Sequence, residues 1–518
     1  MSLVDGVPFY DASTIQRTIN LNSLDIKSVQ RIEVIKGSQS VLYGGQALSG
    51  VIKIETIPRE LKNSGYVLGQ SGSSHDYGGA VGAVQSIGDQ SAVVARGSFA
   101  KEDASSPVLD SKQVYPTQLG SGEIAYINRN SDLHSLIKVQ TTFDKTLIAT
   151  TGNVSYAAAD ADRFETSTYQ LNSTGFFSVP NSYLKPTLAV SLQKSARLFE
   201  QDFFASRGQP TKSDYVGDLL ALRFEVRALD FEDAFQLQLG TSFNQEKMVY
   251  RDADVLKTDQ STEFEGFFAK GQTAFSKHVG FEFGVRSEFN QMKNEIQTYQ
   301  VGASFYEDIR IEYSTGFKQP SLFQLFSSIG NVNLRPEKST STTFSIDHKF
   351  SDNFFLSYSY FISEFENLII ARGNPFIYEN VNSSNTKGHE LAMFLNDFDH
   401  LMTYNLTIGY QEPFDNSQGT WLLRRPLRTA SVKIRKDFEL LGFGGELIHN
   451  GSRRDRAGQS SYGTLSSYTT INLVADYKIA SNALIFSRAQ NIADQRFEST
   501  YGFYDEGLNI KVGAEYDF

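Results

Sequence analysis

Three acidic residues lie close enough along the chain to share a cation: Asp160, Asp162 and Glu165. Calcium takes carboxylate oxygens from flexible loops, so calcium is the metal that this run could hold. The run has neither the glycine nor the length of a calcium-binding loop, and solvated charges are the alternative reading. Apart from this possible calcium site, we expect no cofactor.

No set of nucleophiles and bases has the spacing of a catalytic motif. The chain contains seven histidines, none of them in the pattern of a metalloprotease or a nucleophile motif. It contains no cysteine, which excludes disulfides, thiolate metal sites and cysteine catalysis. We therefore predict that the protein is not an enzyme.

Large aromatic side chains in polar stretches could contact a bulky ligand. Rings in exposed loops can pack against a chelate, whereas rings at the membrane interface act as anchors. Both roles stay open for each candidate. The candidates are Phe203, Phe204, Tyr378, Trp421 and Tyr462.

Strands with two different faces must position these residues, because apolar and polar side chains alternate along much of the chain. Residues 281–289, 309–317 and 508–518 are clear examples. The alternating segments run for about 9–11 residues, which is enough to cross a bilayer when tilted. Backbone groups in hydrocarbon must pair within the protein, so such a sheet has to close. We predict an all-β, antiparallel transmembrane barrel of about 22 strands over residues 59–518, in contact with outer-membrane lipid.

The composition fits this barrel. The chain has 40 Phe and 25 Tyr against one Trp, and aromatic girdles at the two membrane interfaces account for such an excess. A soluble all-β protein, for example a sugar-binding one, would use these rings as core instead. The net charge of −11, with scattered Lys and Arg, argues against a nucleic-acid partner.

Long polar stretches separate several of the strands. Short turns on one side and long loops on the other are typical of outer-membrane barrels, so we interpret the long stretches as external. These stretches are residues 101–118, 200–217, 371–388, 411–425 and 450–466.

The first 58 residues have a different pattern. Residues 23–29 and 38–43 are predicted as short helices, with Ser38 as a possible N-cap of the second. Residues 31–35 and 50–56 are predicted as strands. We expect residues 1–58 to form a small α+β domain separate from the barrel.

This segment resembles the second half of the plug of TonB-dependent outer-membrane receptors. Four ordered runs carry the likeness: LVDGVP at 3–8, VQRIEVIKG at 29–37, SVLYGGQA at 40–47 and GVIKI at 50–54. Weaker likenesses follow in the barrel: GFKQPSL at 316–322, GNVNLRPEKS at 330–339, TKGHEL at 386–391 and QNIAD at 490–494. The plug motif residues are Gly37, Tyr43, Gly44 and Gly50, and glycines here, with Gly45, would let the backbone turn and pass close to the barrel wall.

The chain departs from the family pattern in three ways. It has Lys36-Gly37-Ser38 where Arg-Gly-Pro is usual, and Ser49-Gly50 where a glycine pair is usual. The first half of the plug and the TonB box are not found, so we expect a truncated chain or a missed upstream start. The residues at Met1 do not form a signal peptide.

The resemblance also implies a lock between plug and barrel. The family's basic plug residue falls on Lys36, and its barrel carboxylates fall on Glu337 and Glu390. We predict that Lys36, with Arg31, pairs with these carboxylates, because a charge-assisted pair holds firmly yet can be rehydrated. Lysine lacks the bidentate fork of arginine, and independently solvated lumen charges are the alternative.

The resemblance implies an outer-membrane receptor that takes up a bulky metal chelate, either a ferric siderophore or cobalamin. Its partners would be the chelate, a TonB-type energy-transducing protein and the barrel assembly machinery, whose signal the terminal Tyr516 and Phe518 resemble. The alternatives are a passive porin-like or adhesin-like barrel and a truncated, non-energised receptor.

Overall fold

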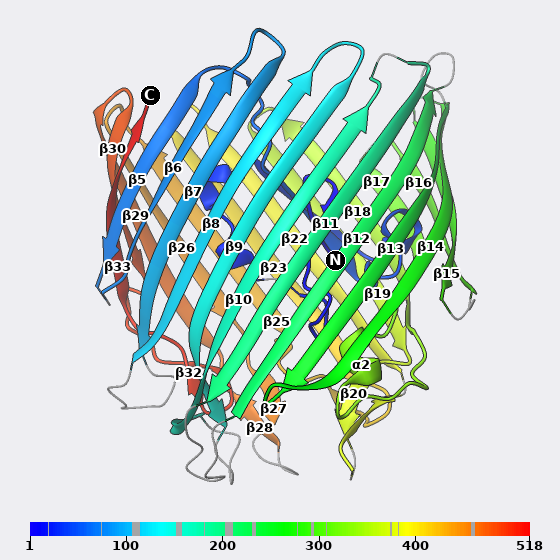
Figure 1. The fold of residues 1–518 in the computed structure, drawn as a ribbon. Coiled ribbons are helices and arrows are strands. Elements are labelled where there is room, and N and C mark those ends of the chain that lie inside the picture. Colours follow the sequence, from blue (N-terminus) through cyan, green and yellow to red (C-terminus); the bar gives the residue numbers. More distant parts are fainter. Residues whose placement is uncertain are drawn as a thin grey trace.

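The computed structural model of the protein is a barrel that encloses a small mixed sheet (Figure 1). Among the described residues, no helix is long and apolar enough to cross a membrane. The described residues are 1–518 except 19, 74, 106–113, 152–157, 181, 202–210, 230–234, 277, 292–294, 307, 373–374, 382 and 457–461.

Within the described residues, twenty-two antiparallel strands close the barrel, and the two-residue strand β24 (Thr420–Trp421) adds beside β23. The last strand, β33, pairs with the first, β5, which closes the sheet. This confirms the predicted fold class and the estimate of about 22 strands. The strands are β5 (Ser64–Gly72), β6 (Tyr77–Ser86), β7 (Ser91–Ser105), β8 (Val114–Arg129), β9 (His134–Thr151), β10 (Ala158–Ser178), β11 (Leu184–Gln201), β12 (Thr211–Leu229), β13 (Phe235–Asp252), β14 (Val255–Ser276), β15 (Val279–Asn290), β16 (Glu295–Phe305), β17 (Ile309–Lys318), β18 (Glu337–Ser351), β19 (Phe354–Glu366), β22 (Ser384–Asp397), β23 (Met402–Asp415), β25 (Arg428–Asp437), β26 (Leu441–Asn450), β29 (Tyr468–Ala480), β30 (Ala483–Gln490) and β33 (Asn509–Asp517).

The strands are not of uniform length, and the expected 9–11 residues is wrong for many of them. β10 has 21 residues and β14 has 22, whereas β5 and β33 have nine each. A tilted strand needs only about ten residues to cross hydrocarbon, so the longer ones continue past the bilayer as paired ribbons. Alternation marks where a strand faces lipid, but it does not mark where the pairing stops.

The two ends of the barrel differ (Figure 1). The C-terminus lies at the end with short turns. The other end, called here the long-connection end, carries the longer links and their small sheets. Within the described residues, the additional elements at that end are α2 (Leu322–Phe326), β20 (Ile369–Arg372) paired with β21 (Ile377–Asn380), β27 (Arg453–Arg456) paired with β28 (Tyr462–Leu465), and β31 (Glu498–Thr500) paired with β32 (Phe503–Tyr504).

All five long polar stretches fall at this end. The flanking barrel strands enter these stretches; for example, β7 runs to Ser105, β11 to Gln201 and β23 to Asp415. Residues 106–113 and 202–210 lie outside the described part.

The burial pattern of the barrel is the reverse of that of a soluble protein, with apolar side chains outside and polar ones inside. Along β15, the side chains of Phe281, Phe283 and Val285 are exposed on the outer surface, while Arg286 and Glu288 are buried inside. An apolar outer face suits hydrocarbon, and a polar inner face suits a filled or wet lumen. The core of this protein is therefore largely polar and lies between the wall and the enclosed domain.

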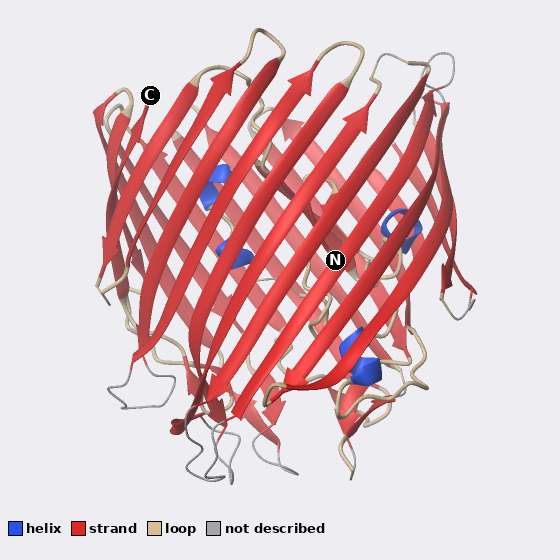
Figure 2. Cartoon of the chain, viewed as in Figure 1, coloured by secondary structure: helices blue, strands red, loops and turns tan. Residues whose placement is uncertain are grey.

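The enclosed domain, residues 1–58, is called the plug from here on. Its four-stranded sheet has the order β2-β1-β4-β3. A few short helical turns lie beside this sheet, and Figure 2 shows them as blue ribbons inside the barrel. The plug elements are β1 (Ser2–Val4), β2 (Val7–Pro8), the 3-10 turns η1 (Leu21–Ser23) and η2 (Ile26–Ser28), β3 (Arg31–Lys36), α1 (Ser40–Tyr43) and β4 (Gly50–Glu55).

Two local expectations for the plug need correction. Residues 23–29 form no α-helix; instead Asn20 and Asp25 each cap a single 3-10 turn through their side-chain oxygens. Ser38 is not an N-cap, because α1 begins one residue later than a Ser38 cap requires. The Ser38 hydroxyl donates to the Leu48 carbonyl and bonds Ser339 of the wall at 2.8 Å.

Candidate functional site

The firmest contact between plug and wall centres on Arg17, whose side chain is 1% exposed. Its Nε lies 2.8 and 2.9 Å from the two carboxylate oxygens of Glu246 on β13. Its Nη1 and Nη2 donate to the carbonyls of Gln319 and Pro320, at 2.7 and 3.0 Å. One plug side chain thus joins β13 to the segment after β17.

Tyr10 completes this cluster. Its hydroxyl donates to Glu246 at 2.7 Å. Burial, followed by the negative charge of Glu246, raises the pKa of the Tyr10 hydroxyl well above its usual range, so the hydroxyl stays a donor. Glu246 is therefore neutralised by Arg17 and hydrogen-bonded by Tyr10, which is what a buried carboxylate needs.

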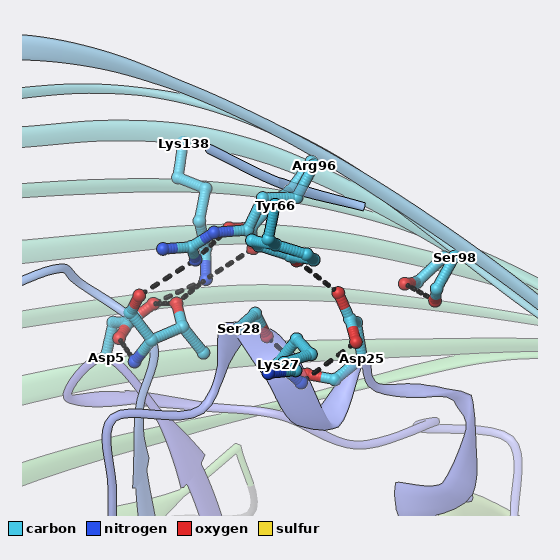
Figure 3. A network of polar contacts seen from close by, with 11 residues as sticks. Asp5, Asp25, Lys27, Ser28, Tyr66, Arg96, Ser98 and Lys138 are labelled. Carbon is cyan, nitrogen blue, oxygen red and sulfur yellow. Dashed lines mark hydrogen bonds and ion pairs between the residues drawn. The ribbon is translucent and has the colours of Figure 1, made fainter. Parts of the chain in front are cut away.

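A second buried cluster holds the N-terminal strand of the plug (Figure 3). Asp5 forms an ion pair with Lys138 of β9, both almost fully buried, and accepts from the amide and hydroxyl of Thr56 at 2.7 and 2.8 Å. Arg96 of β7 donates to the Thr56 carbonyl at 2.9 Å and pairs with Glu123 at 2.6 Å. Strands β7 to β9 thereby hold the plug sheet's central pair, the parallel strands β1 and β4, at the shared end where both strands finish.

The turn at η2 binds the strand next to the barrel closure. Asp25 caps η2 through the Lys27 amide at 2.9 Å and accepts from the Tyr66 hydroxyl of β5 at 2.8 Å (Figure 3). The Lys27 ammonium pairs with Glu515 of β33.

The glycines after α1 lie directly against the wall. A Cβ at Gly44 would lie 2.7 Å from a carboxylate oxygen of Glu288, and one at Gly45 would lie 2.6 Å from the Phe317 ring. Gly44 also has φ +76°, which disfavours other residues. Tyr43 lies beside this contact, with the Arg223 guanidinium 5.7 Å from its ring centre.

The structure brings together only part of the predicted lock. Lys36 pairs with Glu390 on β22, and this pair is open to solvent, with side-chain exposures of 63% and 33%. Glu337 instead accepts from the Ile369 amide at 2.8 Å and lies 3.8 Å from Lys318. The Arg31 side chain lies 3.5 Å from Glu33 within the plug.

The expected pairing of Arg31 with the barrel is therefore wrong, and so is that of Lys36 with Glu337. Arg31 lies at the far end of β3 from Lys36, and a six-residue strand carries it too far from Glu337.

The aromatic candidates have different surroundings. Tyr378 is buried with Leu334 and Ile369, and its contact with a ligand stays a prediction. Trp421 and Tyr462 are exposed; the Arg454 guanidinium covers the Tyr462 ring at 3.9 Å. Phe203 and Phe204 lie outside the described residues.

The calcium candidates have little support in the described part of the chain. Glu165 pairs with Lys145 at 2.9 Å, and the side chains of Asp160 and Asp162 lie outside the description. Among the described residues, no group of three or more His, Asp or Glu side chains is arranged to hold a metal.

A cavity of about 740 Å³, called here the outer chamber, lies between the plug and the wall at the long-connection end. Its plug side includes Arg17, Lys36 and Gly37, and its rim includes Arg425. Hydroxyl groups of β18, β19 and β22 and two phenylalanines form much of the rest. These are Thr343, Ser359, Ser363, Ser384, Thr386, Phe361 and Phe365.

Sequence reasoning missed the strongest contacts. Asp5 lies in the LVDGVP run, but Arg17, Glu246 and Lys138 lie in no recognisable motif. Arg17 is 229 positions along the chain from its partner Glu246. A lone charge on the inner face of a strand is ordinary in such barrels, so only the three-dimensional pairing distinguishes these four.

Family models match most of this chain. The model described as TonB dependent receptor-like, beta-barrel matches residues 86–492. The chain belongs to the TonB-dependent receptor family. The model described as TonB-dependent Receptor Plug Domain matches residues 1–51. As a member of this family, the protein is an outer-membrane receptor or transporter and not an enzyme.

Individual relatives are distant. The Vitamin B12 transporter BtuB of Vibrio vulnificus (strain YJ016) is 23% identical, over 100% of this chain and 84% of the relative. The siderophore receptor PirA from Acinetobacter baumannii has a TM-score of 0.83 at 15% identity, over 100% of this chain and 90% of PirA. The copper transporter OprC has a TM-score of 0.83 at 14% identity, over 100% and 90%. At such identities the solved structures establish a shared fold.

Proposed function

We propose that this receptor takes up a bulky metal chelate, either a ferric siderophore or cobalamin, and that a TonB-type protein energises the transport. The outer chamber carries the proposal. Its volume of about 740 Å³ lies in the range of about 300–1,000 Å³ that is usual for ligand pockets. It opens at the long-connection end, where a ligand from outside would arrive first.

The lining of the chamber suits a large ligand with many polar groups. Hydroxyl groups can exchange hydrogen bonds with a chelate as readily as with water, and Phe361 and Phe365 offer apolar contact. The relatives named above include a vitamin B12 transporter and a siderophore receptor, which supports both ligand classes.

The single tryptophan gives a direct binding assay. Trp421 is half-exposed beside Leu422, which lines the outer chamber. We expect cobalamin or a ferric siderophore that enters the chamber to quench Trp421 fluorescence in a saturable way. Arg425→Ala, at the rim, should weaken this binding, while Arg227→Ala, whose side chain pairs with Glu225 outside the chamber, should not.

Growth provides the test of transport. Cells limited for iron or cobalamin should grow better with the protein than without it. Absence of saturable quenching by either ligand class, together with no growth benefit, would overturn the proposal.

A further inference from the structure

Three successive connections between wall strands meet at the long-connection end. The first connection, residues 416–427, links β23 to β25; the second, residues 451–467, links β26 to β29; the third, residues 491–508, links β30 to β33. Residues 457–461 of the second connection lie outside the described part. Figure 1 shows β27 and β28 of the second connection and β32 of the third at this end.

Asp455, in β27, lies where the three connections meet, and its side chain is 0% exposed. Its Oδ1 accepts from Nε of Arg424, in the first connection, at 2.8 Å. Its Oδ2 accepts from the amide of Tyr501, in the third connection, at 2.7 Å. The two oxygens of one carboxylate therefore serve two different neighbouring connections.

The surroundings of Asp455 suit a charged carboxylate. Burial opposes the charge, but the amides of Tyr501 and Arg456 and the Arg424 guanidinium outweigh it and hold the pKa of Asp455 below its usual range. The Arg456 amide donates to Oδ1 at 2.8 Å. Asp455 is thus ionised near neutral pH, and both of its oxygens are acceptors.

Two further hydrogen bonds join the same connections. The Arg424 amide donates to the Arg454 carbonyl at 2.8 Å, which ties the first connection to the second. The Arg453 guanidinium donates to the Glu498 carbonyl, which ties the second connection to the third. The consecutive residues 453–455 therefore contact both neighbouring connections.

We propose that Asp455 is a clamp that holds the three connections together as one rigid body before any ligand arrives. The first connection includes Leu422 and Arg425, which line the outer chamber, so the clamp fixes part of the mouth in advance. A contact made on the first connection is then transmitted to the third. The clamp needs neither a chelate nor an energy-transducing partner, so it goes beyond the proposed uptake and can fail or succeed independently of it.

The first test is hydrogen exchange of the purified 518-residue chain in detergent micelles, without ligand. In Asp455→Ala, amides of all three connections should exchange roughly 10- to 100-fold faster, because hydrogen bonds to a buried charge are lost on both sides. Amides of the wall strands should exchange as before. Faster exchange in the second connection alone, or equally in the wall strands, would overturn the proposal.

Asp415→Ala is the matched control. Asp415 accepts from the amides of Ser417 and Gln418 at 2.9 and 3.1 Å, within the turn at the start of the first connection. Its removal should speed exchange in the first connection only. Faster exchange in the third connection as well would show that the connections are coupled without Asp455, which refutes the clamp.

Asp455→Asn separates the two sides of the clamp. It keeps the size of the side chain but replaces one acceptor by a donor, and both neighbours present donors. The single oxygen should stay toward Oδ1's two donors, Arg424 Nε and the Arg456 amide. The third connection should therefore loosen more than the first, and equal loosening would contradict the two-sided arrangement.

Spin labels measure the coupling directly, since the chain has no cysteine of its own. Gln418→Cys in the first connection and Ala493→Cys in the third are both at exposed positions. With Asp455 present, the distance between labels at these two sites should have a narrow distribution by double electron–electron resonance. Adding Asp455→Ala should broaden it, and a distribution of unchanged width would overturn the clamp.

Discussion

The buried and the exposed ion pairs between plug and wall use the same kinds of side chain in opposite surroundings. Toward β9 and β13, Asp5–Lys138 and Arg17–Glu246 are ion pairs shielded from water. Toward β22, Lys36–Glu390 is an exposed ion pair. A buried pair whose partner is removed leaves an uncompensated charge, whereas an exposed charge is simply rehydrated. Burial, more than charge, therefore decides which contacts fix the plug.

The largest effect is expected from Arg17→Met. It leaves Glu246 buried without a cation and frees two carbonyls, which should cost about 3–5 kcal/mol of plug docking. Hydrogen exchange of the plug amides would measure this loss. Lys36→Met is the matched control at the exposed pair, and equal effects of the two substitutions would contradict the comparison.

Gly44→Ala should come next. The new Cβ would meet Glu288 at 2.7 Å in a backbone conformation with φ +76°, so strain and overpacking together should cost about 2–4 kcal/mol. The midpoint of plug release in urea would report this cost. Gly6→Ala separates the two causes, because Gly6 also has positive φ but has no neighbour within 4 Å, and it should lose less stability.

Tyr10→Phe should have a smaller effect. It removes one hydrogen bond to Glu246, while Arg17 still neutralises the carboxylate, so about 1.5–3 kcal/mol of docking should be lost. The same hydrogen-exchange measurement applies. Combined with Arg17→Met, the losses should not add, because both side chains act on one carboxylate. If the two losses of docking free energy added strictly, Tyr10 and Arg17 would act independently on Glu246, which would contradict this prediction.

Lys36→Ala should change stability least, by about 0–1 kcal/mol, because the pair that it breaks is exposed. It should nevertheless increase ion leakage through the reconstituted barrel, since it removes the ion pair between β3 and β22. Unchanged leakage would count against any role of Lys36 in holding the plug.

Much of the architecture could be predicted because it depends on local pattern. Alternation along residues 281–289 or 508–518 identifies a strand with one apolar face, and hydrocarbon then requires the sheet to close. The runs around Gly37 and Gly44 identified the family. The resemblance to that family then predicted the ion pair between Lys36 and Glu390. Ser38 shows the limit of local reasoning. Its hydroxyl was expected to cap a helix, but it forms a hydrogen bond with Ser339 of the wall instead.

The sequence alone determined that this chain closes into a barrel with a plug-like segment before it, because both facts follow from short-range periodicity and ordered motifs. Only the tertiary structure decided which lumen charges are buried, with Arg17 meeting Glu246 across 229 positions. It also decided that the Lys36–Glu390 pair is exposed. The physical reason is that inward-facing polar residues look alike along every strand. Whether water or the plug covers them depends on where a separate domain comes to rest.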